Sequence, residues 1–335
     1  MSPPDTSLPR EEAEALVARA FVAAGATEDN ALSTARALVA AEIDGQKGHG
    51  FSRVASYAAQ LRSGKLRGDA IPELQTRGAR IDVDAQDGFA FPAIEQAIAE
   101  LARLAPETGV AMAAIRRSHH CGQLGAHVER LAEAGLVALM VANTPKAMAP
   151  WGGHAPLFGT NPIAFAAPRD GAPPLVIDLS LSKVARGKVM AASKSGQPIP
   201  EGWALDAEGN PTTDPAAALA GTMLPAGDAK GAALALIVEV LAATLTGANR
   251  SDEASSFFDA EGPAPGVGQM ILAFDTSAVP DFGRRIEALL GAITDQPGTR
   301  LPGQKRLDGR GAANGGQQVT LPGHLRAEIE SLAGA

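Results

Sequence analysis

The sequence is poor in cysteine, aromatic residues and long apolar runs, and each shortage excludes a class of protein. Its 335 residues include one cysteine, Cys121, which excludes an internal disulfide framework and suits a reducing compartment. Acidic residues (37) outnumber lysine and arginine (29), and the net charge of −8 lacks the basic footprint of a nucleic-acid-binding protein. No stretch reaches the roughly 18 apolar residues of a membrane helix, and no run of signal-peptide type opens the chain. We therefore expect a cytoplasmic protein with no nucleic-acid or membrane partner.

Two common ligand motifs are missing as well. No G-x-G-x-x-G follows a strand and opens a helix, and there is no P-loop, so a bound dinucleotide needs a scaffold other than the Rossmann fold. The six histidines lack the H-E-x-x-H or paired Cys/His spacing of a zinc site, and we expect no metal.

The patterns that are present favour an α/β core with a helical layer built from the two ends of the chain. The length fits about two domains. Helices are predicted over residues 10–25, 27–45 and about 50–64, and from residue 79 onward strands alternate with helices. We assign residues 1–72, 225–250 and 280–335 to the helical domain, and residues 73–224 and 251–279 to the α/β domain. Residues 308–318, DGRGAANGGQQ, are predicted to form a Gly-rich loop.

The stretch SHHCGQLG, residues 118–125, is a candidate phosphate cradle. Here a predicted strand gives way to a turn and then a helix, and ligands of α/β proteins collect at the carboxyl ends of strands. Gly122 and Gly125 let a ligand approach the backbone, and the N–H groups of the next helix can bind an anion. His120 lies at the edge of this cradle.

The stretch GQKGHGFSR, residues 45–53, suggests acid–base chemistry. A spacing of four places His49 and Arg53 on one face of a predicted helix. A neutral imidazole can exchange a proton with a carbonyl oxygen, and a guanidinium can grip a carboxylate. Together they could hold a 2-oxo acid, although the same pattern also fits a solvated basic face.

Six stretches, in order and spacing, resemble the type-2 malate/L-lactate dehydrogenase family over about residues 10–305. They are GHGFSR, SHHCG, PWGGHAPLFGTNPIAFAAP, IDLSLSKVARGK, IPEGWALDAEGNPTTDP and MLPAGDAKGAALAL. The resemblance implies a non-Rossmann oxidoreductase with a mixed-sheet NAD(P)-binding domain, usually a homodimer. It implies hydride transfer between the nicotinamide and a small anionic 2-oxo or 2-hydroxy acid.

The resemblance also implies roles for individual residues. His49 matches a substrate-side acid/base histidine, Arg53 a carboxylate anchor, and His120 a histidine beside the nicotinamide that is a second candidate for the proton transfer. Thr160 and Lys188 match the substrate side. Positions on the cofactor side are Cys121, Gly122, Thr144, Asp178, Leu179, Ser180, Lys230 and Gly303. Lys305 and Arg306 follow in the same loop and could pair with a 2′-phosphate, which favours NADP(H), with NAD(H) as the alternative.

Two departures from the family pattern bear on the substrate. Gly48 replaces the serine that commonly precedes the first histidine, and Lys188 replaces an acidic residue of the cyclic imino acid reductases. Positive charge at Lys47, Arg53, Arg186 and Lys188 suits a dianion, such as malate or sulfolactate, and the stretches are most similar to the family's (2R)-3-sulfolactate dehydrogenases. The alternatives are a reductase of piperideine- or pyrroline-2-carboxylate and a catalytically inactive binding protein of the same fold.

Overall fold

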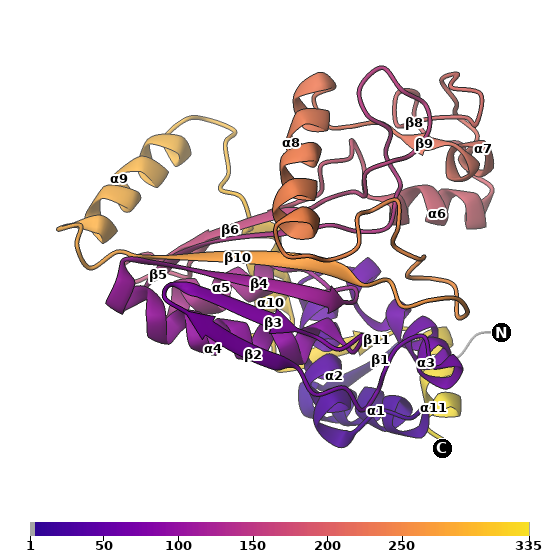
Figure 1. The fold of residues 1–335 in the computed structure, drawn as a ribbon, viewed down its shortest axis with the longest axis horizontal. Coiled ribbons are helices and arrows are strands. Elements are labelled where there is room, and N and C mark those ends of the chain that lie inside the picture. The colour runs from indigo at the N-terminus through magenta and orange to yellow at the C-terminus, as the bar shows by residue number, and fades with distance from the viewer. Residues whose placement is uncertain (1–3, 335) are drawn as a thin grey trace.

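A seven-stranded mixed sheet forms the centre of the molecule in the computed structural model, which describes residues 4–334 (Figure 1). In spatial order its strands are β2 (Glu73–Arg77), β3 (Arg80–Asp84), β4 (Val110–Ser118), β10 (Val267–Asp275), β5 (Leu136–Ala142), β6 (Ile163–Ala167) and β7 (Leu175–Leu179). Only β3 and β4 run parallel, and the other neighbours are antiparallel. A Rossmann sheet is built from parallel strands, so the predicted non-Rossmann α/β class with a mixed sheet is confirmed.

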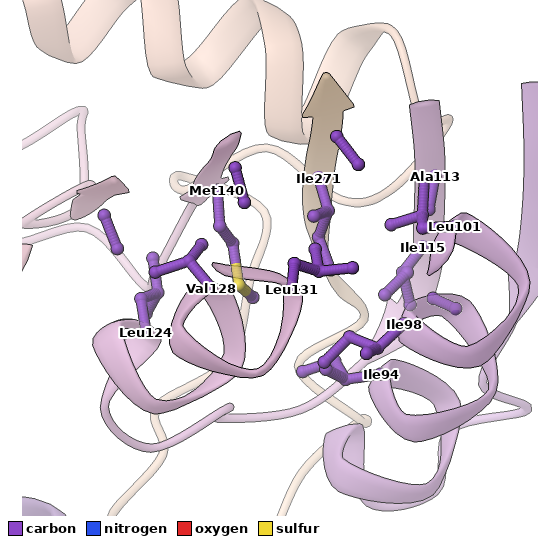
Figure 2. Packing of buried hydrophobic residues seen from close by; sticks show 14 of the residues in the cluster. Ile94, Ile98, Leu101, Ala113, Ile115, Leu124, Val128, Leu131, Met140 and Ile271 are labelled. Carbon is purple, nitrogen blue, oxygen red and sulfur yellow. The ribbon is translucent and has the colours of Figure 1, made fainter. Parts of the chain in front are cut away.

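Two helices, α4 (Ala90–Thr108) and α5 (Leu124–Glu133), cover one face of the sheet and build the main core (Figure 2). Ile94, Ile98 and Leu101 recur at helical spacing, so they share one face of α4 and point at the sheet. They meet Ile115 of β4 and Ile271 of β10, both fully buried. This apolar layer fixes the ends of β4 and α5, and the turn between them carries His120.

The opposite face is covered by α8 (Ala229–Glu239) and a π-helical turn, η3 (Val240–Thr244). Ala235, Val238 and Ala242 pack there against Val141 and Met270 of the sheet. Residues 225–250 were expected to join the helical domain, but the structure places this segment on the sheet, because its small buried side chains allow close approach. The division into two domains otherwise stays a prediction. Beyond α8 lie α6 (Arg186–Ser195), α7 (Pro215–Ala220) and the pair β8 (Ala204–Leu205) with β9 (Thr222–Met223) (Figure 1).

The helical layer is built from both ends of the chain, as predicted. It contains α1 (Arg10–Ala23), α2 (Glu28–Ile43), α3 (Val54–Ser63) and α11 (Gly323–Leu332). Thr27 caps α2 by accepting the N–H of Asn30, and Gly64 ends α3 with a φ of 78°. The sequence analysis missed the antiparallel pair β1 (Thr6–Pro9) and β11 (Gln318–Leu321), which joins the two ends.

Two helices follow β10. The helix α9 (Phe282–Thr294) stands off from the rest of the fold, with an ion pair from Arg169 to Glu287 (Figure 1). The helix α10 (Gln304–Ala312) includes part of the segment that was predicted to be a Gly-rich loop. That prediction was wrong over residues 308–312, because Arg306 and Arg310 tie the segment to Glu129. Within residues 4–334 no helix is long and apolar enough to cross a membrane.

Candidate active site

The candidate site lies where the helical layer meets the sheet, and its first half is the segment between α2 and α3. His49 ends a 3-10 turn, η1 (Lys47–His49), and Arg53 ends a second one, η2 (Phe51–Arg53). The two side chains therefore do not share one regular helix, as the spacing had suggested. Gly50 separates the turns because a side chain there would collide with Glu42, whose carboxylate accepts the N–H of Phe51 at 3.2 Å.

The second half of the site is the turn after β4, which brings His120 to His49. His49 Nδ1 and His120 Nε2 lie 3.0 Å apart, and the ring planes differ by 5°. On its other side His120 Nδ1 lies 2.5 Å from the hydroxyl of Tyr57, which is fully buried in α3. A chain of three side chains thus runs from the interior to His49. Tyr57 lies in the helix predicted over about residues 50–64, but nothing in the sequence pattern singled out its hydroxyl.

The tautomers of both histidines follow from this network. The backbone N–H of Gly122 points at His120 Nδ1 from 3.4 Å, so Nδ1 is an acceptor and Tyr57 donates to it. His120 then carries its proton on Nε2 and donates to His49 Nδ1. His49 consequently carries its own proton on Nε2, an atom that has no hydrogen bond within residues 4–334 and is accessible.

Burial keeps both histidines neutral. Desolvation, reinforced by the charge of Arg53, lowers the pKa of His49 to about 4. The same two causes lower the pKa of His120 well below its usual value, with further contributions from the two neighbouring histidines. Burial also raises the pKa of Tyr57, so its hydroxyl keeps its proton. The site therefore presents one neutral N–H donor, His49 Nε2.

Arg53 lies beside this donor and has hydrogen-bonding capacity to spare. Its Nε donates to the carbonyl of Gly48 at 2.6 Å, but its buried Nη1 has no partner among the described residues. Desolvation lowers the pKa of Arg53, and a bound anion would offset the free-energy cost of that desolvation. The guanidinium can therefore bind an anion next to His49.

A long loop between η3 and β10, residues 251–266, closes one side of the site; we call it the strap. Phe257 packs against the rings of His119 and His120, each with centroids 5.4 Å away. Phe258 lies over the guanidinium of Arg53, with Cζ 4.6 Å from the ring centroid. These contacts leave no sign in the sequence, because only the fold brings residues 51–57 and 257–258 together.

The predicted cofactor-side residues form two groups, and hydrogen bonds connect the members within each group. In the first, Asp178 at the end of β7 accepts the N–H of Gly125 at 2.7 Å, next to Cys121 and Gly122 in the turn that carries His120. In the second, Thr144 Oγ1 accepts the N–H of Thr160 at 3.0 Å. The backbone continues this link, because Leu181 donates to Thr160 and Ala226 donates to Leu181. These bonds place the residues just before α8 beside Leu181, which directly follows Leu179 and Ser180.

The remaining predicted residues differ in accessibility. Lys188, Lys230 and Lys305 are exposed, and Gly303 approaches the carbonyl of Val176 so closely that a side chain there would collide with it. Arg306 is buried instead, with ion pairs to Glu129 and Asp44. Its two terminal nitrogens donate to Glu129 and its Nε is buried, so the structure does not favour the expected contact with a 2′-phosphate. Burial raises the pKa of Cys121 to about 12, which makes its thiol unreactive.

Three comparisons relate this chain to known proteins. A family model described as malate/L-lactate dehydrogenase matches residues 8–330. A (2R)-3-sulfolactate dehydrogenase (NADP(+)) of Chromohalobacter salexigens is 55% identical over 96% of this chain and 96% of that protein. The structure of a delta1-piperideine-2-carboxylate reductase from Pseudomonas syringae pv. tomato matches with a TM-score of 0.92 and 37% identity over 98% of this chain and 99% of that one. A sulfolactate dehydrogenase from Methanocaldococcus jannaschii matches with a TM-score of 0.89 and 27% identity over 98% of both chains.

Proposed function

This chain belongs to the malate/L-lactate dehydrogenase family, and from that premise we propose that it is an NADP(H)-dependent 2-hydroxy acid dehydrogenase. The proposed reaction interconverts sulfopyruvate and (2R)-3-sulfolactate, with oxaloacetate and malate as the next candidates. The 55% identity to a relative named for sulfolactate and NADP(+) supports this choice. The observation that carries the proposal is the pairing of an accessible His49 Nε2 with an unpartnered Arg53 Nη1.

In this proposal Arg53 binds the substrate carboxylate and His49 handles the proton. The carboxylate satisfies Arg53 Nη1 and offsets its positive charge, which is one of the two causes that hold the pKa of His49 low. Substrate binding therefore raises the pKa of His49 and lets it take up a proton. In the reduction direction protonated His49 gives its Nε2 proton to the carbonyl oxygen and keeps a proton on Nδ1, which donates to His120 Nε2 while His120 carries its own proton on Nδ1. In the oxidation direction this neutral, Nδ1-protonated form of His49 accepts the hydroxyl proton at Nε2, and the added proton is afterwards released to solvent.

His120 and Tyr57 act as positioning residues. Both nitrogens of His120 are already hydrogen-bonded, so it has no free atom for the substrate, and it fixes the tautomer of His49 instead. We therefore assign the proton transfer, which the sequence left open between the two histidines, to His49.

The residues around the turn after β4 fit a dinucleotide. The carboxylate of Asp178 can accept from ribose hydroxyls, exposed Leu179 offers an apolar contact, and exposed Lys230 and Lys305 can pair with phosphate groups. When bound there, NADPH supplies the hydride that reduces the carbonyl carbon. Thr144 and Thr160 line the junction between this region and the substrate side.

The second substrate class is a cyclic imine such as piperideine-2-carboxylate. The likeness to a delta1-piperideine-2-carboxylate reductase favours it, and Lys188 at the position of the acidic residue disfavours it. A side-by-side assay of NADPH oxidation with sulfopyruvate, oxaloacetate, pyruvate and piperideine-2-carboxylate separates the two. We expect the highest kcat/KM with sulfopyruvate. A preference for the cyclic imine, or no turnover with any 2-oxo acid, contradicts the proposal.

We also propose that the protein works in the cytoplasm as a homodimer. The family resemblance supports the dimer, and so does the outer side of α8 and η3. Four large apolar side chains are exposed there, which are Leu234, Leu236, Ile237 and Val240. An exposed cluster of this kind typically marks a protein interface. The single buried cysteine suits a reducing compartment.

A further inference from the structure

The strap, residues 251–266, is held by donors from a single short stretch of the helical layer. Lys65 is buried, and its Nζ donates to the carbonyls of Ser256 and Asp259 at 2.8 Å and to that of Glu261 at 3.3 Å. Gln60 Nε2 donates to the carbonyl of Phe257 at 2.7 Å. Three carbonyls that converge on one buried ammonium fix the path of a loop that has no secondary structure of its own.

The stretch that holds the strap continues directly from the helix that starts beside Arg53. Gln60 lies in the last turn of α3 and Lys65 lies two residues beyond its end, whereas Arg53 immediately precedes the helix. Any displacement of the strap relative to α3 therefore changes the distance between the strap and the guanidinium. Phe257 is buried against the histidines, and Phe258 is 44% exposed and faces Arg53.

The ring of Phe258 covers the guanidinium of Arg53 but, as a hydrocarbon, does not hydrogen-bond to it. An aromatic ring attracts a cation through its face, and it blocks water from that face. Of the guanidinium donors, Nε is bonded to the carbonyl of Gly48, whereas buried Nη1 has no partner within residues 4–334. A carboxylate can thus bind in the plane of the guanidinium while the ring covers it from above.

We propose that Phe258 is a specificity-determining residue of the substrate site, whose ring covers Arg53 and sets its affinity for a carboxylate, and that Lys65 is the positioning residue that holds the ring there. The inference rests on the proposed function for its substrate. It predicts a preference for small carboxylic acids, because the ring occupies the space beside the anchored carboxylate. It assigns no part in proton transfer to Phe258, since the contact involves Arg53 alone.

Substitutions of Phe258 test the proposal because they should change KM and leave kcat nearly unchanged. Phe258→Ala is expected to raise the KM for sulfopyruvate about three- to thirtyfold, because the uncovered guanidinium regains water that the carboxylate must displace, with kcat within twofold of the wild type. Phe258→Leu keeps an apolar cover without a ring and should raise KM by less, whereas Phe258→Tyr should restore the wild-type KM. Phe274→Ala removes another exposed phenyl ring, from the far end of β10, and serves as the control. An unchanged KM in Phe258→Ala, or no recovery in Phe258→Tyr, overturns the assignment.

Variants of the anchor test the role of Lys65. Lys65→Met should raise the same KM with little change in kcat, and Lys65→Arg should recover part of the loss. If Lys65→Met does not fold, Ser63→Ala removes the milder hydrogen bond from Ser63 Oγ to the carbonyl of Ala260 and should raise KM by a smaller factor. A normal KM in every folded anchor variant contradicts the positioning role.

A binding measurement separates this inference from the proposed function. Calorimetry with sulfoacetate, an unreactive carboxylate, reports on the Arg53 site whether or not the protein turns over sulfopyruvate. Wild-type binding that weakens in Phe258→Ala supports the inference even if the substrate panel fails. Equal affinity in both proteins overturns it even if the panel succeeds.

Discussion

His49 Nδ1 accepts a hydrogen bond from His120 Nε2 across 3.0 Å, and this bond leaves His49 Nε2 as the accessible donor of the pair. The two histidines therefore have different roles, which the sequence did not distinguish. One is a fully bonded support, and the other faces the substrate side with an exchangeable proton. Because the substrate-side atom belongs to His49, the two residues should respond differently to substitution.

Loss of His49 should affect the chemical step more than loss of any neighbour. His49→Gln keeps a polar side chain but cannot act as an acid or base at neutral pH, and we expect kcat to fall by about 10²- to 10⁴-fold. Arg53→Ala should chiefly raise KM, because Arg53 contacts the carboxylate rather than the reacting oxygen. Steady-state NADPH oxidation with sulfopyruvate measures both. A His49→Gln variant with near wild-type kcat contradicts the assignment.

Tyr57 should influence catalysis through the tautomer of His120. Tyr57→Phe removes a buried hydroxyl and leaves the ring packing intact, so the protein should fold normally. A lost hydrogen bond of about 1 to 1.5 kcal/mol corresponds to roughly a five- to tenfold drop in kcat. His127→Gln is the control, because His127 is also a buried side chain and within residues 4–334 its hydrogen bond goes to the carbonyl of Cys121. Equal kcat in Tyr57→Phe and the wild type refutes the relay to His49.

The pH dependence of the oxidation direction should reveal the low pKa of His49. Neutral His49 is the base for this direction, so activity is present above its pKa and is lost as the pH falls through it. Because that pKa is about 4 in the free protein, kcat/KM for sulfolactate should stay constant between about pH 6 and 8. An unperturbed histidine would give an inflection near pH 6.5. An acid limb centred between pH 6 and 7 would therefore count against a desolvated His49.

Lys305 and Arg306 are sequence neighbours with different surroundings, and variants should separate their roles. Lys305→Ala removes an exposed charge and should raise the KM for NADPH more than that for NADH, with an unchanged melting temperature. Arg306→Ala leaves Glu129 paired with Arg310 and should destabilise the fold by about 1.5 to 3 kcal/mol, the range for a lost hydrogen bond to a charged group. Urea unfolding and cofactor kinetics measure the two effects. A selective loss of NADPH binding in a stable Arg306→Ala variant contradicts the structural role.

The apolar side of α8 should mediate self-association. Leu236→Glu or Ile237→Lys places a charge on an exposed face, so neither disturbs the core of a single subunit. We expect a dimer for the wild type and a monomer for both variants by light scattering after gel filtration. The exposed Leu289 on α9 provides a control position, and Leu289→Glu should leave the dimer intact. Dimeric Leu236→Glu and Ile237→Lys variants place the interface elsewhere.

The sequence predicted those features that depend on local pattern, and it missed those that depend on contacts across the chain. Periodicity and glycine positions identified the helical ends and the α/β core, and the quoted stretches identified the family and with it the mixed sheet. The break at Gly50 was missed because it depends on Glu42, which lies one helix away. The loop predicted around residue 310 is helical because its arginines meet buried acids from α5 and the end of α2. Tyr57 and the strap were missed for the same reason, since neither contact leaves a local signature.

The central claim is that His49 transfers the proton while Arg53 holds the carboxylate. A crystal structure with NADP⁺ and (2R)-3-sulfolactate tests it most directly, through the distance from His49 Nε2 to the 2-hydroxyl oxygen. We predict a distance of about 2.6 to 3.2 Å, with the carboxylate paired to Arg53 beneath the ring of Phe258. A hydroxyl oxygen beyond hydrogen-bonding reach of His49, or a carboxylate bound away from Arg53, would contradict the account.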